Sequence, residues 1–356
     1  MPTTAPPGLL DRDLSKAEAR QAIDLAVPLL TEIVNQGLAV LARCFAPPIQ
    51  GDVHMAVLLP FHHLLEMLDG VQLLVGEAAP SAARPQLRSM LEALLYIEHI
   101  TETGPDTLQY AIRGYAYLVA RTRDALKALR ALRRYDAATP EGQDLIARSV
   151  VKVDRSIEDI DRNIAHLEAR LVKTPWSDVD SSRQALHRSK GPWYCLGTGT
   201  PSNLGNLADR LGRSVYYDVL YRDYSGAVHA ADTSRQVIAH APGRVEIRRL
   251  RDPDELHNVV CIAVDLALGA IERVLLTYRP QEQRVHKLWY LPESVARVWQ
   301  LQSVTLEQRA AQPRAHRDGA RMNHARVPSR RNRTPTPFPA PARDAWTAPR
   351  GARVSD

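Results

Sequence analysis

The chain is poor in cysteine and in aromatic residues. Its three cysteines, Cys44, Cys195 and Cys261, lie far apart, are odd in number and form no CxxC pair or Cys/His cluster, which excludes a disulfide framework and a zinc site. Aromatic residues make up 6% of the chain, whereas Ala, Leu and Arg dominate, and this favours helices over sheets. We therefore expect an all-α protein that uses no metal and no cofactor.

Nothing in the sequence is typical of export or of a simple membrane span. The N-terminal residues Met-Pro-Thr-Thr-Ala-Pro-Pro-Gly contain no basic region followed by an apolar one. The most apolar run, residues 55–75, includes helix-disrupting and polar residues that a simple span does not tolerate. These are Pro60, His62, His63, Glu66 and Asp69. We expect a soluble, cytoplasmic protein with no membrane partner.

Positive charge is concentrated at the C-terminal end. From Ser303 onward the chain has 11 Arg and 4 acidic residues, a balance of +7, which leaves 35 basic and 36 acidic residues, or −1, for residues 1–302. The net charge of +6 is therefore no argument for a nucleic-acid groove on the folded part. Residues 305–356 are rich in Arg, Pro and Ala and have too few apolar residues for a core, so we expect a disordered tail. Residues 1–14 are expected to be flexible.

Apolar residues repeat at helical spacing through most of residues 15–300, which predicts one all-helical bundle. Ser15-Lys16-Ala17-Glu18 has the pattern of a capping box and predicts a helix start, and the helix should end before Pro47. Further helices are expected near residues 54–75, 85–100, 204–211 and 253–278. Ser202 should cap the 204–211 helix, and Gly212 should end it. Residues 173–201 are expected to be a linker that docks through Trp176 and Trp193, and residues 236–250 could form a small β-hairpin.

Residues 106–173 have the pattern of a long antiparallel helical hairpin. Apolar residues of the second arm alternate spacings of four and three, typical of a coiled-coil seam. They are Ile146, Val150, Val153, Ile157, Ile160, Ile164, Leu167 and Leu171. The first arm offers Leu118, Ala125, Leu129 and Leu132, and also a basic run: Arg121, Arg123, Lys127, Arg130, Arg133 and Arg134. This run either pairs with Glu158, Asp159, Asp161 and Glu168 across the hairpin or forms a ridge that follows phosphates; we favour the pairing.

The segment from Tyr216 to His229 is the candidate functional element, within motif-bearing helices over residues 202–278. Read as an α-helix, it has an apolar stripe of Tyr217, Tyr221, Tyr224 and Val228 beside a polar stripe of Asp218, Arg222, Ser225 and His229. Arg222 and His229 would lie roughly 10 Å apart along the axis and about 20° apart around it, so both could face one ligand. Alternatively, Asp218 and Arg222 form an ordinary ion pair one turn apart, and His229 is hydrogen-bonded at the edge of the core.

Two resemblances concern this segment. The pattern Leu204-x-x-Leu207-Ala208-x-x-Leu211-Gly212 followed by Tyr-Arg-x-x-Ser-x-x-Val-His, together with the upstream run Arg88-Ser89-Met90-Leu91-Glu92-Ala93, resembles a bacterial all-helical domain family of unknown function over about residues 55–275. Arg222, Asp223 and His229 are similar to the HEPN superfamily motif, an Arg and a polar residue followed by a His, at the longest permitted spacing.

The second resemblance implies a metal-independent endoribonuclease of a toxin-antitoxin or phage-defence system. His229 would be the general acid/base, Arg222 would stabilise charge on the phosphate, and Asp223 would orient the site. Ser225, Tyr221, Asp218, Arg88 and Glu92 would support them. The implied partners are RNA, an antitoxin or other regulatory protein, and a second copy in a homodimer. The alternative is a non-catalytic helical scaffold or nucleotide-binding module, in which Arg88, Glu92, Asp218, Arg222 and His229 form a buried polar network.

Overall fold

A computed structural model describes residues 12–45, 51–138, 140, 157–188, 191–196, 201–223, 237–240, 244–247, 251 and 253–311. The expected flexible N-terminus lies outside this part up to residue 11, and the expected disordered tail lies outside it from residue 312. The upper part of the predicted isoleucine seam, residues 146–153, is also outside the described residues.

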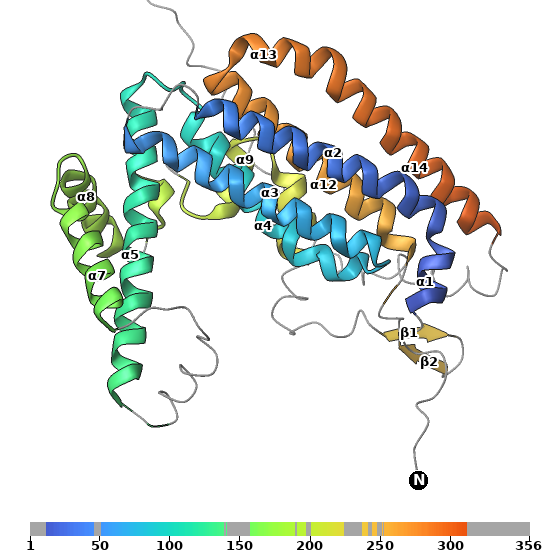
Figure 1. The fold of residues 1–356 in the computed structure, drawn as a ribbon, viewed down its shortest axis with the longest axis horizontal. Coiled ribbons are helices and arrows are strands. Elements are labelled where there is room, and N and C mark those ends of the chain that lie inside the picture. Colours follow the sequence, from blue (N-terminus) through green and yellow to red (C-terminus); the bar gives the residue numbers. More distant parts are fainter. Residues whose placement is uncertain are drawn as a thin grey trace, which may run out of the picture. The chain divides into compact units, whose positions relative to one another are not determined.

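The described part of the chain is helical apart from one short pair of strands, which confirms the all-α prediction (Figure 1). The helices of the first half are α1 (Arg12–Glu18), α2 (Arg20–Cys44), η1 (Asp52–His54), α3 (Met55–Gly76), η2 (Pro80–Ala83), α4 (Arg84–Thr101) and α5 (Leu108–Ala138). Next come α7 (Ile157–Leu171), α8 (Trp176–Arg188), η3 (Trp193–Cys195), α9 (Leu204–Arg210), α10 (Ser214–Tyr216) and η4 (Tyr217–Asp223). The last are η6 (Pro253–Glu255), α12 (Leu256–Tyr278), α13 (Pro280–Val285), η7 (His286–Tyr290) and α14 (Leu291–Ala311).

The expected β-hairpin is present as two short antiparallel strands. They are β1 (Val237–His240) and β2 (Arg244–Ile247), in which Val237 pairs with Ile247 and His240 with Arg244. In the sequence, Pro242-Gly243 lies between the two strands, and this dipeptide favours a chain reversal.

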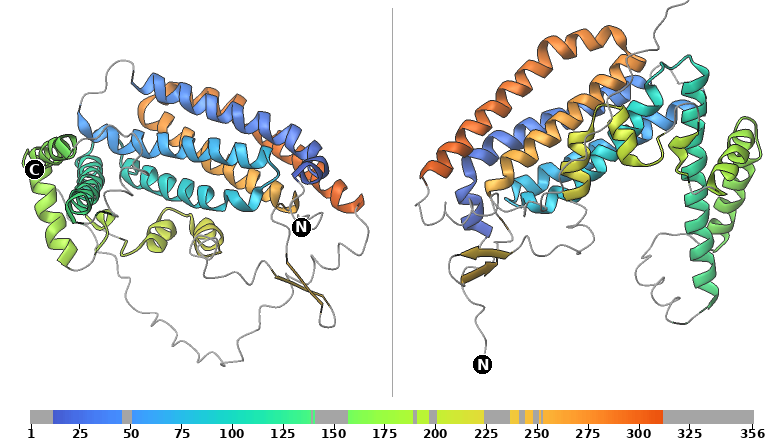
Figure 2. Two further views of the ribbon diagram at one scale, coloured as in Figure 1. Left: turned by 60° about the horizontal axis from the view of Figure 1, so that its bottom comes forward. Right: turned by 180° about the vertical axis from the view of Figure 1, so that it is seen from behind.

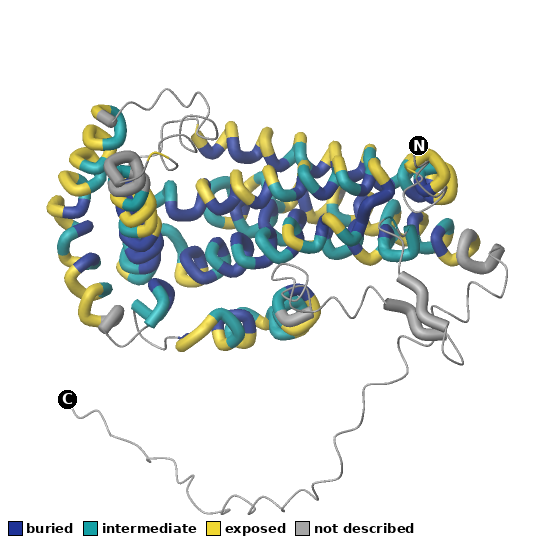
Figure 3. Tube along the Cα trace, turned by 90° about the horizontal axis from the view of Figure 1, so that it is seen from below, coloured by how far each residue is buried: buried dark blue, intermediate teal, exposed yellow. Residues whose placement is uncertain are grey.

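The core lies where α2, α3, α4 and α12 pack side by side (Figures 1 and 2). Each helix turns leucine, valine and alanine side chains toward the others, and Leu30, Leu68, Leu94 and Ala267 are fully buried. Figure 3 shows these buried stretches on the facing sides of the helices and exposed residues on the outer sides. Helix-spaced apolar residues thus produce the bundle because each stripe removes its apolar surface from water only against another stripe.

Helix α2 is, among the described helices, the one long and apolar enough to cross a membrane by length and composition. One third of its most apolar window is buried inside the bundle, against α3, α12 and α14. Glu32 of α2 accepts a hydrogen bond from Arg297 of α14, at 2.5 Å, so a charged pair joins these two helices. A core helix near the N-terminus passes the same length test, and the cytoplasmic location stays a prediction.

Helices α5, α7 and α8 form the hairpin region (Figure 2). The antiparallel arms were predicted, but α8 occupies residues expected to be linker. Its first residue, Trp176, is 3% exposed and packs edge-on against Tyr115, with the Arg170 guanidinium 4.3 Å from its ring. Trp176 is therefore the docking point that was expected, at the start of a helix rather than within a loop.

The basic run on α5 pairs with carboxylates across the hairpin, as the favoured interpretation states. Arg130 donates to Glu168 at 2.5 Å, and Arg133 donates to Asp161 at 3.1 Å. Arg123 donates to Asp180 of α8. This partner was not predicted, because residues 173–201 were expected to be a linker. Between these pairs lies an open groove of about 430 Å³, lined by Arg123, Leu126, Lys127, Arg130 and Arg133. Leu126 is buried and Ala125 is exposed, so the predicted seam was wrong at Ala125.

Asp180 offers a test of this pairing. Asp180 is 5% exposed and accepts hydrogen bonds from Arg123 at 3.0 Å and from Gln184 at 2.9 Å. Burial raises the pKa of this carboxyl group, but the hydrogen bonds and the charge of Arg123 outweigh it, so the pKa is lowered. Replacing Asp180 by Ala is expected to destabilise the fold by about 1–3 kcal/mol, because the partly buried Arg123 loses its partner. Urea unfolding measures this. The exposed Asp178 on the same helix is the control, and equal effects at both positions would contradict the role of the pair.

Three helix ends differ from the prediction. Ser15 lies buried within α1 rather than at a helix start, because α1 begins at Arg12 and α2 follows from Arg20. Asn203, rather than Ser202, caps α9, since its side chain accepts from the backbone N–H of Asn206 at 2.9 Å. Helix α14 continues to Ala311, so residues 305–311 of the predicted tail are helical, and Thr305 is buried.

Candidate functional site

The element that carries Arg222 is a π-helix. After α9, a left-handed Gly212 with φ of 71° turns the chain into α10 and then into η4, where backbone bonds run from i to i+5. An α-helix was predicted over residues 216–229. The wider turn changes which side chains face the bundle: Leu220 is fully buried, Tyr217 and Tyr221 are half-buried, and Asp218 is exposed. π-Helices are rare and are frequent at functional sites.

Tyr221 joins η4 to α4 through a stacked column. Its ring lies parallel to that of Tyr217, with centroids 4.9 Å apart and planes 12° apart. The guanidinium of Arg88 lies 4.0 Å from the Tyr221 centroid. Gly205 of α9 closes the other end, since a Cβ atom there would lie 3.0 Å from the Tyr217 ring. The column fixes Arg88 by a cation–π contact, an interaction typical of Arg.

Glu92 lies one turn after Arg88 on α4 and faces the same region. Arg88 Nε and Glu92 Oε1 are 3.5 Å apart, and the two side chains are 16% and 32% exposed. Burial raises the pKa of Glu92, although Arg88, Arg121 and His63 act in the opposite direction. A buried carboxyl group with a raised pKa and a specific charged partner is a feature that is frequent at functional sites.

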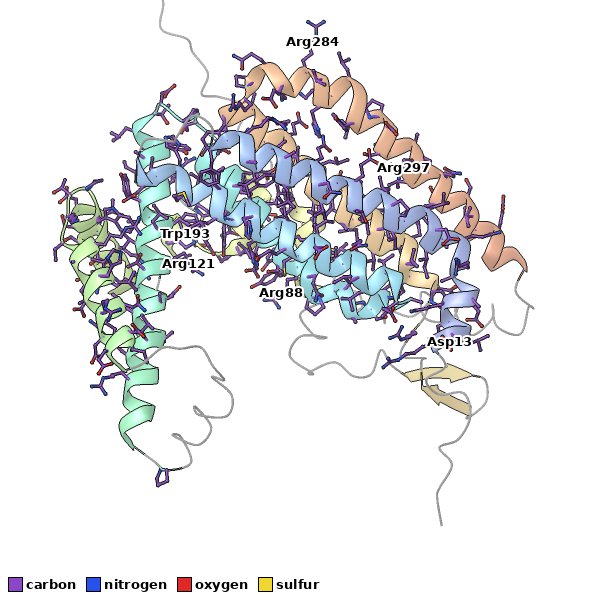
Figure 4. The ribbon with its side chains drawn as sticks, in the orientation of Figure 1. Asp13, Arg88, Arg121, Trp193, Arg284 and Arg297 are labelled. Atoms are coloured by element: carbon purple, nitrogen blue, oxygen red, sulfur yellow. The ribbon has the colours of Figure 1, made fainter. Side chains whose placement is uncertain are left out.

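An aromatic cluster borders this carboxyl group. Trp193 of η3 is 5% exposed and contacts three tyrosines edge-on: Tyr96 at 5.2 Å, Tyr117 at 5.3 Å and Tyr194 at 5.6 Å between centroids. Burial and the charge of Glu92 raise the pKa of Tyr96. Arg121 of α5 lies over Tyr117, with its guanidinium 5.8 Å from the ring centroid. Figure 4 marks Arg88, Arg121 and Trp193 in this region.

Sequence patterns predicted part of this arrangement. Arg88, Glu92 and Tyr221 were expected to support one site, and the structure brings them together. Trp193 was expected only as a docking residue, and Tyr96 and Tyr117 beside it were missed because they come from helices far from it in the sequence. The one available signal was the concentration of scarce aromatic residues in residues 193–194 and 216–224.

Glu98 of α4 and Glu102, which directly follows α4, hold the segment before η4 in place. Arg213 donates to both oxygens of Glu98, at 2.7 to 3.3 Å, and Arg210 pairs with Glu102. Arg113 of α5 also donates to Glu102, at 2.6 Å. Tyr216 donates to Asp265 of α12. Bidentate arginine pairs fix orientation as well as distance, so α9, α10 and η4 have a defined position on the bundle.

The predicted catalytic residues are only partly within the described structure. The backbone of Arg222 and Asp223 forms the end of η4, and their side chains are outside the described part. Ser225 and His229 lie entirely outside it. Asp218 is exposed on η4 and is therefore not a buried member of a polar network. Among the described residues, no group of three His, Cys, Asp or Glu side chains could hold a metal ion.

Comparison with known proteins identifies a family without an assigned activity. No curated protein and no solved structure matches the chain. Residues 54–240, more than half of the chain, match the family of unknown function DUF5677. This range begins at the end of η1 and ends with β1. It includes Arg88, Glu92, Trp193 and Tyr221 of the site described above, whereas Asp265 of α12 lies outside it. The chain therefore belongs to DUF5677, a family of unknown function.

Proposed function

We propose that the protein is a HEPN-like, metal-independent endoribonuclease. One observation carries the proposal: Arg222 and Asp223, the first two residues of the motif, end a π-helix that packs on α4 beside the Arg88–Glu92 pair. An irregular helix held by arginine pairs and stacked rings positions side chains more rigidly than a loop does. The family match includes this element, which supports a role in whatever the family has in common.

The proposed reaction is cleavage by the neighbouring ribose hydroxyl. The 2′-oxygen attacks the phosphorus, the bond to the 5′-oxygen breaks, and the products are a 2′,3′-cyclic phosphate and a 5′-hydroxyl. His229 removes the proton from the 2′-hydroxyl and returns one to the leaving oxygen. Arg222 stabilises the negative charge that develops on the phosphate, and Arg88 supports it. Asp223 orients the site, and Ser225 contributes a hydrogen bond.

The direct test is incubation of the purified protein with total RNA in EDTA. Wild-type protein is expected to cut RNA and to leave cyclic phosphate ends, whereas His229→Ala is not. Cleavage by both proteins alike would indicate a contaminating nuclease, and cleavage by neither would contradict the proposal. The His62→Ala variant is a matched control, because His62 is exposed on α3 and is paired only with Glu66, at 3.7 Å, in the described structure.

A second function, a non-catalytic scaffold or nucleotide-binding module, is favoured by one feature. Arg88 is largely buried and is already engaged by Tyr221 and Glu92, as expected for a structural contact between α4 and η4. The two functions differ in what Arg88→Ala changes. A scaffold loses stability, since Glu92 then keeps a partly buried charge without this partner. A nuclease loses cleavage rate in addition.

The proposal also includes the expected biology of such an enzyme: a bacterial, cytoplasmic toxin or phage-defence effector with RNA as substrate. A regulatory protein such as an antitoxin would restrain it, and two copies would work together. These points come from the resemblance of Arg222-Asp223 and His229 to the HEPN motif.

The C-terminal segment is expected to add affinity for RNA. Residues 312–356 contain 10 Arg and 3 acidic residues, and basic residues that bind phosphates release counterions. Deleting them after Ala311 should leave helical circular dichroism and melting temperature almost unchanged, because α14 ends there. Binding of single-stranded RNA, measured by fluorescence anisotropy at several salt concentrations, should become weaker and less dependent on salt. A large fall in melting temperature would show that this segment is part of the core.

A further inference from the structure

The groove on α5 is lined by cations and one apolar side chain. Arg123, Lys127, Arg130 and Arg133 contribute the positive charges, and Leu126 is the fifth lining residue. Its volume of about 430 Å³ is within the size range of ligand sites, and α7 and α8 lie beside α5 (Figure 1). Among the described residues, no carboxylate group lines the groove. The groove therefore offers positive charge to a ligand.

Lys127 gives the groove a charge that no described carboxylate balances. The other three cations each have a carboxylate partner on α7 or α8. The pairs are Arg123–Asp180, Arg130–Glu168 and Arg133–Asp161. Lys127 is exposed and forms no ion pair with a described residue. One positive charge thus remains for an anionic ligand.

The ion pairs fix the arginines without using all of their hydrogen-bond donors. Arg130 donates to Glu168 through Nη2, and Arg133 donates to Asp161 through Nε. A guanidinium group has five N–H donors, so both arginines have further donors to offer. Arginines that are already held in position suit phosphate oxygens, because little side-chain freedom is lost on binding. Pairing across the hairpin is therefore compatible with phosphate binding in the groove.

The cations form a row along one side of α5. Positions 123, 127, 130 and 133 are three or four residues apart, the spacing of neighbours on one helix face. From Arg123 to Arg133 the row covers about 15 Å of helix. A small ligand is normally enclosed by convergent groups, whereas an open row of cations follows successive phosphates of a single strand. The row is short for a duplex, since modules that bind double-stranded RNA span about 16 base pairs.

We propose that this groove binds the backbone of single-stranded RNA that extends from the candidate site. Arg121 lies two residues before Arg123 on α5, with its guanidinium over Tyr117 of the aromatic cluster, and its charge acts on Glu92. The site and the groove thus share α5, and a strand can follow this helix from one to the other. The choice of RNA as the strand rests on the proposed function. The substrate is then single-stranded and continues for several nucleotides beyond the bond that is cut.

Binding of an uncleavable RNA tests the groove. A single strand of about 12 nucleotides with 2′-O-methyl groups has no 2′-hydroxyl, so its binding to the full-length protein can be measured by fluorescence anisotropy without cleavage. Lys127→Gln is expected to weaken binding about five-fold at about 0.1 M salt and to lower the slope of log affinity against log salt by about 0.7, the contribution of one phosphate contact. Its melting temperature should not change, because Lys127 has no described ion pair to lose. Lys173→Gln is the control, since Lys173 is exposed between α7 and α8 and does not line the groove.

Four outcomes decide between the alternatives. Equal affinity and equal salt slope in wild type and Lys127→Gln would overturn the proposal. A duplex whose binding depends on Lys127 as strongly as that of the single strand would overturn it too. Displacement of the strand by pyrophosphate or by a polyglutamate peptide, in wild type but not in Lys127→Gln, would show that the groove takes a small phosphate or an acidic protein segment instead. Binding through Lys127 by a protein that cuts no RNA would support the groove and contradict only the nuclease.

Discussion

Lowering the pH from 7 to 5 is expected to destabilise the bundle by about 2 kcal/mol through His99 alone. His99 is 1% exposed, and its ring accepts a hydrogen bond at Nδ1 from Arg210 Nη2, 3.2 Å away. Burial, with Arg113 and Arg210 nearby, lowers its pKa to about 3. The folded state therefore keeps the ring neutral, whereas the unfolded chain takes up a proton near pH 6.5.

The sign of the effect follows from these two pKa values. Stability is complete above about pH 7 and falls as the pH decreases from about 6.5 toward 3, because only the unfolded state gains a proton in this range. Most carboxylates stay ionised down to about pH 5, so the interval from pH 7 to 5 reports on histidines. His54 and His286, whose pKa values are also lowered by burial, should add to the loss.

Urea unfolding at several pH values measures this slope. His99→Gln cannot titrate, so its free energy of unfolding should change less between pH 7 and 5 than that of the wild type, even if it is less stable at pH 7. The exposed His62 is the control, and His62→Gln should keep the wild-type slope. A wild-type slope in His99→Gln would mean that the buried ring is protonated in the folded state.

The core helices could be predicted because their signal is local. Leu30, Leu68 and Leu94 repeat with their neighbours at helical spacing, and Pro47 and Pro85 mark helix boundaries in the sequence itself. Helix α12 is the clearest case, since its buried leucines and valines follow one another without a polar interruption on the inner side. Such apolar stripes predict a helix from the sequence alone, without knowledge of the helices that pack against it.

The site could be predicted only in part because it depends on contacts between distant segments. Arg88 and Glu92 are visible as a pair one turn apart, but the stacking of Tyr221 on Arg88 requires η4 to lie on α4. The π-helical geometry was missed, since the stripe of Tyr217 and Tyr221 fits an α-helix equally well in the sequence. Helix α8 was missed because its serines and charges resemble a linker, and its stability comes from Asp180 and Trp176.

These differences point to the same part of the molecule. The spacing of apolar residues predicted an α-helix at η4, but the backbone hydrogen bonds there are those of a π-helix. The local composition predicted a linker at η3, but Trp193 and Tyr194 are buried there despite the surrounding Ser, Gly and Pro. Segments in which local preference and final structure disagree are often functional, because the surrounding fold must maintain them. Both segments pack on α4, where Trp193 and Tyr194 of η3 contact Tyr96 and Tyr221 of η4 lies against Arg88.

Replacing Arg222 or His229 by alanine is expected to lower RNA cleavage by about 100- to 10,000-fold. The double variant should lose little more than either single variant, because residues that act on one phosphate as a unit are not additive. Single-turnover rates on a short RNA, measured with enzyme in excess, report this directly. Melting temperatures of the three variants should stay close to that of the wild type.

The opposite pattern has a distinct physical cause. If Arg222 and His229 serve only to hold η4 against the bundle, removing either leaves polar groups without partners, at about 1–3 kcal/mol each. Melting temperatures would then fall by several degrees for each variant, and the wild-type protein would not cut RNA. Unchanged melting with lost cleavage supports the nuclease, whereas lowered melting without any cleavage contradicts it. Because Glu92 has a raised pKa, the Glu92→Gln variant of an active enzyme should in addition change the pH dependence of the rate, an effect that a scaffold has no means to produce.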